Sequence, residues 1–259
     1  MGTWIALLKL RIAVLITFSG IAAAVLTATR PDAGVLILLA LALMLASAGA
    51  GALNHAIDVD IDARMRRTSQ RPIPSGRVRR RTAVAAGLGL VVVALVVATV
   101  SMNRWVALHL FGGVFVYVVI YTAWLKRRSA INIVVGGLAG SFAALAGGAS
   151  VRQDLCLPPI LLAAILFFWT PPHFWALAIA YEDDYRGAGV PMLPVVQGPK
   201  RTAGWILVHT VALVAVSLIP LIWRAQHPMY IAAAAALGAY YLWENLQLLR
   251  WPSQVSARR

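Results

Sequence analysis

The chain has 259 residues, of which 61% are apolar and only 12% charged, and its formal net charge is +14. Soluble domains carry about 25% charged residues, so this composition excludes an ordinary soluble globular protein. The single cysteine, Cys156, excludes an intramolecular disulfide, and no cysteine–histidine cluster has the spacing of a zinc site. The positive charge does not indicate nucleic-acid binding, because the bases lie in short segments between apolar runs, where membrane topology accounts for them.

Apolar runs of about 20 residues recur along the chain, which is the length that a helix needs to cross a bilayer. The sequence therefore predicts an all-α, polytopic membrane helical bundle that forms a single domain over residues 1–259. The first run lacks a small-residue cleavage site, so it is expected to remain as a membrane helix. The eight expected spans are 10–28, 35–56, 82–101, 105–125, 130–150, 157–180, 204–223 and 229–249.

Basic residues divide unequally between the two sides of these spans. Of the 23 Lys and Arg residues, nineteen lie on one side. Such a bias marks the cytoplasmic side, so the N-terminus, both long loops and the C-terminus are expected in the cytoplasm. The four on the other side are Arg30, Arg104, Arg152 and Arg224.

The segment 54–81 concentrates acids and bases directly after the second span. Asn54, Asp58 and Asp62 are spaced by four and would share one face of a helix, whereas Asp60 would point elsewhere. Carboxylates of this kind suit Mg²⁺ held together with substrate phosphates, and arginine forks match phosphate oxygens. The alternative is a solvated loop whose charges only set the topology. The arginines that follow within three turns are Arg64, Arg66, Arg67 and Arg71.

A second acidic cluster, Glu182 to Asp184, follows a later span on the same side. Acids in a membrane bundle usually face a cavity, a partner or a metal, so convergence of the two clusters favours a site. The segment 181–202 that contains the cluster is rich in Gly and Pro, which disfavours one continuous helix. Because the middle of this segment is apolar, we expect a lid over the cavity rather than a plain connecting loop.

Tyr121 and Lys126 end the fourth span, where a phosphate would be within their reach. The alternative is that Tyr121 is only an aromatic residue of the membrane interface and Lys126 only a positive residue that sets the topology. His173, preceded by two prolines within the sixth span, is a functional candidate, whereas His109 is expected to be structural. The glycines of the fifth span predict close helix packing; these are Gly136, Gly137, Gly140, Gly147 and Gly148.

The motif N-x-x-x-D-x-x-x-D is complete at Asn54, Asp58 and Asp62, and with it the chain resembles the intramembrane (UbiA-type) prenyltransferase family typified by 4-hydroxybenzoate polyprenyltransferase. Further stretches resemble the protoheme IX farnesyltransferase (heme O synthase) branch of that family, and the likeness runs over essentially the whole chain. These stretches are DIDARMRRTSQRPIPSGR, YTAWLKRRSAINIVVGGLAG, PPHFWALAI and DYRGAGVPMLPVV.

The resemblance implies a helical bundle around a central cavity that opens to lipid, in the bacterial cytoplasmic (inner) membrane. It implies transfer of the farnesyl group of farnesyl diphosphate to a vinyl group of heme b, with water addition, to make heme O for terminal oxidases. Heme A synthase or a terminal oxidase assembly partner would be a neighbour, and nucleic acid would not be a partner.

The same resemblance implies roles for individual residues. Mg²⁺ would be the cofactor, and its ligands would be Asn54, Asp58, Asp62 and Asp184. Asp58, Asp62 and Lys126 would be catalytic. Substrate would be bound by Asn54, Arg67, Arg71, Tyr121, His173, Asp184 and Tyr185, with the cations and Tyr121 on the diphosphate and His173 at the heme.

The chain departs from the family pattern in three places. The second motif lacks the spaced D-x-x-x-D of the quinone enzymes, as the heme branch also does. The segment after Gly140 lacks an expected double proline, which affects the shape of the fifth helix. The family usually has nine helices, and this chain is expected to end before the last of them.

Three other functions stay open on the sequence alone. The first is a related prenyltransferase that acts on a quinone precursor or chlorophyllide. The second is a transporter or channel, which would place acids near the bilayer midplane within inverted repeats. The third is a non-catalytic assembly protein, against which the intact acidic motif and Lys126 argue.

Overall fold

The computed structural model describes residues 2–220 and 228–258, and every regular element in them is a helix. Seven helices in this part are long and apolar enough to cross a membrane. This confirms an all-α, integral membrane bundle; the central cavity that opens to lipid stays a prediction. The seven are α2 (Leu10–Thr27), α3 (Ala33–Ile57), α5 (Arg80–Ser101), the helix Arg104–Arg127, α7 (Asn132–Val151), α8 (Leu157–Ala180) and α10 (Leu193–Leu218).

The last two expected spans differ in detail from the structure. Helix α10, which contains the seventh, begins at Leu193 and consists of two helical pieces that meet at a kink at Gly198 (φ 80°, ψ 162°). The expected start at residue 204 lies in the piece after the kink, and residues 221–223 of the expected range lie outside the described residues. The eighth is a helix, α12 (Pro228–Arg250), but it is not among the seven. Its sequence carries Glu244 and several amide and aromatic groups, which lower its hydropathy.

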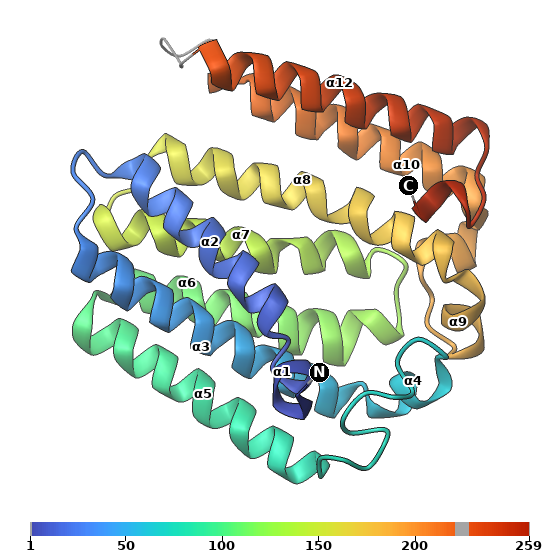
Figure 1. Ribbon diagram of the computed structural model, residues 1–259, viewed down its shortest axis with the longest axis horizontal. Coiled ribbons are helices and arrows are strands. Elements are labelled where there is room, and N and C mark those ends of the chain that lie inside the picture. Colours follow the sequence, from blue (N-terminus) through green and yellow to red (C-terminus); the bar gives the residue numbers. More distant parts are fainter. Residues whose placement is uncertain (1, 221–227, 259) are drawn as a thin grey trace.

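Packing between neighbouring helices gives the bundle its order. Helix α7 packs against α8, α2 and α6 (Arg104–Phe115), while α3 packs against α2 and α5. Helix α8 also packs against α10, and α10 packs against α12. Figure 1 shows α10 and α12 along one side of the bundle and α5 along the opposite side.

Small residues fill much of the interior of the bundle, and many large apolar residues lie on its outer surface. The fully buried side chains include many alanines of α3, α5 and α7, whereas Val100 and Phe18 are 79% and 68% exposed. This distribution is typical of helices in lipid, where close backbone approach stabilises the bundle. Gly147 illustrates the closeness, since a Cβ there would lie 2.0 Å from the carbonyl oxygen of Gly20 in α2.

Several short helices and a long loop gather at one end of the bundle. Figure 1 shows α1 (Thr3–Leu7), α4 (Val59–Arg64) and α9 (Glu182–Gly187) there, with the loop 65–79 between α4 and α5. The fourth spanning helix reaches the same end by changing its winding. After α6 it continues as a π-helix, η1 (Val116–Trp124), and a short 3₁₀ turn, η2 (Leu125–Arg127).

Candidate active site

Asn54, Asp58 and Asp62 lie side by side although the helix that carries them is interrupted. Helix α3 ends at Ile57 and α4 begins at Val59, with Asp58 between them. The helical spacing persists, because the Asp58 amide donates to the Asn54 carbonyl (2.9 Å) and the Asp62 amide to the Asp58 carbonyl (2.8 Å). All three side chains are buried, at 3%, 0% and 2% exposure. The shared face that the spacing predicts is therefore present.

Basic side chains from three separate segments neutralise these acids. The Lys126 ammonium donates to Asp58 Oδ2 at 2.5 Å, and Arg71 Nη1 donates to both oxygens of Asp62 at 2.8 and 2.9 Å. Lys9, from the turn before α2, donates to Asn54 Oδ1. Burial, and then the positive charges of Arg71 and Lys126, lower the pKa of Lys9 to about 7. Lys126 and Arg71 thus pair with the two carboxylates, and Lys9 adds a third basic group beside Asn54.

The amide of Asn54 links the acids to the π-helix. Its Nδ2 donates to Asp58 Oδ2 (2.9 Å) and to Thr122 Oγ1 (3.0 Å), while the Thr122 hydroxyl donates to the carbonyl of Tyr117 (2.7 Å). π-Helical turns are rare and are frequent at functional sites. Here the wide winding brings Tyr117 and Thr122 to the network from one segment. Lys9, Tyr117 and Thr122 were not predicted as site residues, because nothing in the sequence distinguishes them from topology and core residues.

Tyr121 lies beside this network in the same π-helix. Its ring stacks on that of Tyr117, with 5.8 Å between the ring centres and 20° between the planes. Gly136 in α7 permits this position, because a Cβ at residue 136 would lie 2.8 Å from the Tyr121 ring. Close packing is likewise found at Gly137, Gly147 and Gly148, whereas Gly140 faces open space.

The second acidic cluster docks against the first loop. Asp184 Oδ2 accepts from the backbone amide of Arg67 (3.1 Å), and Asp184 Oδ1 accepts from Arg66 Nε (3.5 Å). The Arg67 guanidinium lies over the ring of Tyr181, 5.2 Å from its centre. The two polar segments therefore meet at one end of the bundle, as the sequence predicts.

The other members of the segment 181–202 also have defined places. Glu182 pairs with Arg186, and Asp183 accepts from Gln254 Nε2 at 3.1 Å. Tyr185 packs against an apolar cluster that includes the buried Val190 and Met192. The segment is not one continuous helix, because α9 ends at Gly187 and α10 begins at Leu193, as the Gly and Pro content predicts. That the segment acts as a lid stays a prediction.

The predicted metal ligands do not form one compact group. Among the described residues, no three His, Cys, Asp or Glu side chains gather closely enough to hold a metal ion. Two carboxylates remain, those of Asp58 and Asp62, which is a typical protein share when phosphates and water complete the shell of Mg²⁺. Asp58 Oδ1 is buried and lacks a hydrogen-bond partner, so one oxygen is available. Asp58 and Asp62 fit such an ion, and the metal role of Asp184 stays a prediction.

His173 lies in α8 and is not joined to the acidic cluster. Its ring stacks on Trp169, with 4.5 Å between the ring centres and 12° between the planes. Helix α8 continues through Pro171 and Pro172, which are both buried. His109 was expected to be structural, and its Nδ1 forms a hydrogen bond with the carbonyl oxygen of Trp105 in the same helix at 2.7 Å.

Asp60 points away from the site, as its position in the sequence predicts. It forms a two-pronged ion pair with Arg127, with 2.7 Å from each guanidinium nitrogen to an oxygen of Asp60, and the two side chains are 47% and 34% exposed. Hydrogen bonds from Arg127 lower the pKa of Asp60 to about 2. The pair therefore stabilises the fold above about pH 4, and this contribution is lost as the pH falls toward 2.

We expect Asp60→Asn to reduce the free energy of unfolding by at most about 1 kcal/mol, because exposed ion pairs contribute little. Activity at neutral pH should be unchanged. Thermal unfolding in detergent at pH 7 and pH 3 measures this effect, and the difference between wild type and variant should shrink at pH 3. A constant difference would contradict the assigned ion pair.

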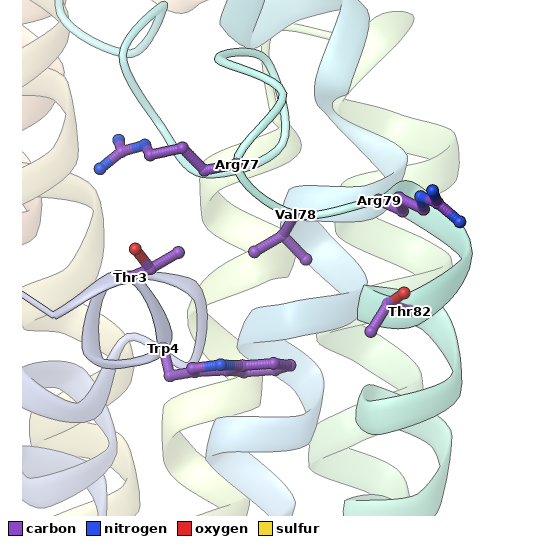
Figure 2. Close-up of a pocket in the computed structure, with 6 residues that line it drawn as sticks. All are labelled: Thr3, Trp4, Arg77, Val78, Arg79 and Thr82. Atoms are coloured by element: carbon purple, nitrogen blue, oxygen red, sulfur yellow. The ribbon is translucent and has the colours of Figure 1, made fainter.

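A pocket of about 560 Å³ lies at the same end of the bundle (Figure 1) but has a different lining. It opens between α1 and the start of α5, and Figure 2 shows the Trp4 indole along one wall with Arg77 and Arg79 directed outward. None of the predicted site residues lines it. The lining residues are Thr3, Trp4, Arg77, Val78, Arg79 and Thr82.

Comparison with known proteins gives both a family and a fold. The sequence model that describes the UbiA prenyltransferase family matches residues 13–259 of this chain. The chain is 50% identical over 164 residues to protoheme IX farnesyltransferase 2 of Paramagnetospirillum magneticum (63% of this chain, 57% of that protein). It is 56% identical over 156 residues to protoheme IX farnesyltransferase 1 of the same organism (60% and 55%). The chain thus spans about half the length of the curated relatives it matches.

Solved structures with low sequence identity share the fold. A digeranylgeranylglyceryl phosphate synthase superposes with a TM-score of 0.81 at 18% identity, over 99% of this chain and 90% of that chain. A UbiA homologue from Archaeoglobus fulgidus bound to DMAPP and Mg²⁺ superposes with a TM-score of 0.78 at 17% identity, over 95% and 87%. These likenesses confirm the predicted architecture.

Proposed function

This chain belongs to the UbiA prenyltransferase family, and we propose that it transfers the farnesyl group of farnesyl diphosphate to a vinyl group of heme b, with addition of water, to make heme O. The observation that carries the proposal is the pairing of Asp58 and Asp62 with Lys126 and Arg71 at one end of an apolar bundle. The choice of heme as acceptor rests on the relatives named protoheme IX farnesyltransferase, which are about half identical to this chain over the aligned regions.

The acidic cluster is where a divalent metal and the diphosphate would bind. Asp58 and Asp62, with Asn54 and with Asp184 from the second segment, are the proposed ligands. Mg²⁺, when bound together with the diphosphate, supplies positive charge to the departing oxygen. The homologue bound to DMAPP and Mg²⁺ supports this choice of metal, as does the free oxygen of Asp58.

Lys126 and Arg71 are the cations that would bind the diphosphate. They lie within hydrogen-bond distance of the two acids, so they would lie close to a diphosphate that binds there. Arg67 and Tyr121 would add donors from the first loop and the π-helix, and Tyr185 would support the substrate from α9. Together they stabilise the negative charge that develops on diphosphate as the allylic C1–O bond breaks, which is electrostatic catalysis.

The apolar bundle protects the farnesyl cation that this ionisation leaves. Exclusion of water from the chain-binding region prevents premature hydrolysis. The π electrons of a heme vinyl group form the new carbon–carbon bond, water adds to the resulting cation, and the proton that water loses leaves with solvent or diphosphate. His173, which lies within α8 beside Trp169, is the proposed contact for the heme.

The proposed location is the bacterial cytoplasmic membrane with the site facing the cytoplasm. The excess of Lys and Arg at the end of the bundle that carries α4 and α9 supports this orientation. A cytoplasmic site gives water-soluble diphosphate and Mg²⁺ direct access. Heme A synthase or a terminal oxidase assembly partner would receive the product.

The test combines purified protein, heme b, farnesyl diphosphate and Mg²⁺, with pigments separated by mass. The expected product carries farnesyl plus water on heme, and EDTA should abolish its formation. Parallel reactions with a quinone precursor and with chlorophyllide in place of heme test the acceptor. Prenylation of one of these without any heme product would overturn the heme assignment and leave the prenyltransferase assignment standing.

A further inference from the structure

Lys9 has an unusual backbone conformation for its residue type. Its φ of 49° and ψ of 42° lie in the left-handed region, and it is the one non-glycine residue with positive φ in the described part of the chain. Residues other than glycine, asparagine and aspartate rarely adopt this region, because their Cβ comes too close to the following carbonyl oxygen. The turn between α1 and α2 therefore holds Lys9 in a strained conformation, which is a frequent feature of functional residues.

Tight packing fixes the turn against α3. Leu7, directly before the turn, is completely buried. A Cβ on Gly51 in α3 would lie 3.2 Å from the carbonyl oxygen of Leu8 and 3.4 Å from Lys9 Cβ. Gly51 is one helical turn before Asn54, so the lysine side chain is directed along α3 toward the acidic site.

The Lys9 ammonium determines the orientation of the Asn54 amide. It donates to Asn54 Oδ1, and also to the Tyr117 hydroxyl at 3.2 Å. Lys9 Nζ is the donor in this contact, so the amide presents its oxygen to Lys9. Nδ2 then faces Asp58 Oδ2 and Thr122 Oγ1, to which it donates.

This orientation determines which oxygen of Asp58 is available. Asn54 Nδ2 and the Lys126 ammonium both donate to Oδ2 of Asp58, at 2.9 and 2.5 Å. Oδ1 is left buried without a partner. Oδ1 of Asn54 keeps a second lone pair, so the two free acceptor positions belong to the proposed metal ligands.

We propose that Lys9 is a positioning residue: through the Asn54 amide it holds Asp58 with Oδ1 available to the metal–diphosphate. Without Lys9 the amide can turn over, which would place its NH₂ group where an oxygen ligand is needed. The inference rests on the proposed function of this site. Groups that orient metal ligands typically change metal affinity or activity by about 10- to 100-fold when they are removed.

The test measures Mg²⁺-dependent binding of a non-reactive farnesyl thiodiphosphate to the full chain, so it needs no acceptor. Lys9→Met should raise the Mg²⁺ concentration for half-maximal binding by about 10- to 100-fold, while Lys9→Arg should restore most of the affinity. Arg11→Met is the matched control, because Arg11 is an exposed base two residues further on, and it should bind as wild type does. Lys9→Gln, whose amide is too short to reach, replaces Lys9→Met if that variant does not fold.

A double variant separates positioning from direct contact. If Lys9 acts through Asn54, then Lys9→Met should add less than about threefold to the loss already caused by Asn54→Ala, since coupled residues are not additive. Fully additive losses would mean that Lys9 contacts the substrate directly and would overturn the proposal. Wild-type affinity in Lys9→Met would also overturn it, without affecting the proposed function. A wild-type chain that binds no diphosphate at any Mg²⁺ concentration would overturn both.

Discussion

Asp58→Asn should lower the rate of prenyl transfer by at least about 10²- to 10³-fold, the effect of removing even one preorganised hydrogen-bond donor that stabilises a transition state. Asp58 is completely buried, and it contacts both Asn54 and Lys126. The substitution keeps the shape of the side chain but removes the charge that would hold a metal. The rate of product formation, measured with saturating farnesyl diphosphate, tests this result.

The same substitution leaves the partly buried Lys126 ammonium without its anionic partner, which should destabilise the protein by up to about 3–5 kcal/mol, the cost for a fully buried pair. The double variant Asp58→Asn/Lys126→Met removes both charges and should recover much of the lost thermal stability without recovering activity. Asp60→Asn, two residues away on the exposed side, is the matched control. Equal activity losses in Asp58→Asn and Asp60→Asn would contradict the assignment of Asp58 to the site.

Gly147→Ala should cause the largest loss of stability among single small substitutions in α7. A Cβ there would lie 2.0 Å from the Gly20 carbonyl oxygen and 3.0 Å from Ala23 Cβ. Because the nearest obstructing group, the carbonyl of Gly20, belongs to the backbone of α2, it cannot rotate away, and the two helices must separate. Overpacking of this kind costs about 1–3 kcal/mol or more, which would appear as a lower midpoint in thermal unfolding of the detergent-solubilised protein.

Gly140→Ala is the control in the same helix, because nothing lies within 4 Å of its Cβ position. Alanine favours a helix over glycine by about 1 kcal/mol, so this variant should be as stable as wild type or slightly more so. A similar loss in both variants would mean that α7 tolerates no added methyl group, and would contradict a specific α2–α7 contact.

Local patterns in the sequence predicted the bundle and much of the site. Long apolar runs identified the spanning helices, because lipid requires every backbone group to bond within its own helix. The spacing of Asn54, Asp58 and Asp62 placed them on one face, and the structure keeps this spacing even through the break at Asp58. Asp60 was correctly separated from them by the same geometry.

Features that depend on tertiary contact were beyond local patterns. The π-helix of residues 116–124 has no sequence signature, and it determines where Tyr117 and Thr122 meet Asn54. The contribution of Lys9 depends on a left-handed turn that lysine does not favour. A first helical piece of α10 forms before Gly198 because Val190, Met192 and Leu193 are buried in an apolar cluster, while Gly198 still interrupts the helix as a kink.

The central claim is that the cluster of Asp58, Asp62, Lys126 and Arg71 binds a metal–diphosphate. The most direct measurement is calorimetric binding of farnesyl thiodiphosphate to the purified chain, with and without Mg²⁺, for wild type, Asp58→Asn and Asp60→Asn. The account predicts binding that requires Mg²⁺, survives in Asp60→Asn and is lost in Asp58→Asn. Binding that is independent of Mg²⁺, or that is unchanged in Asp58→Asn, would contradict it.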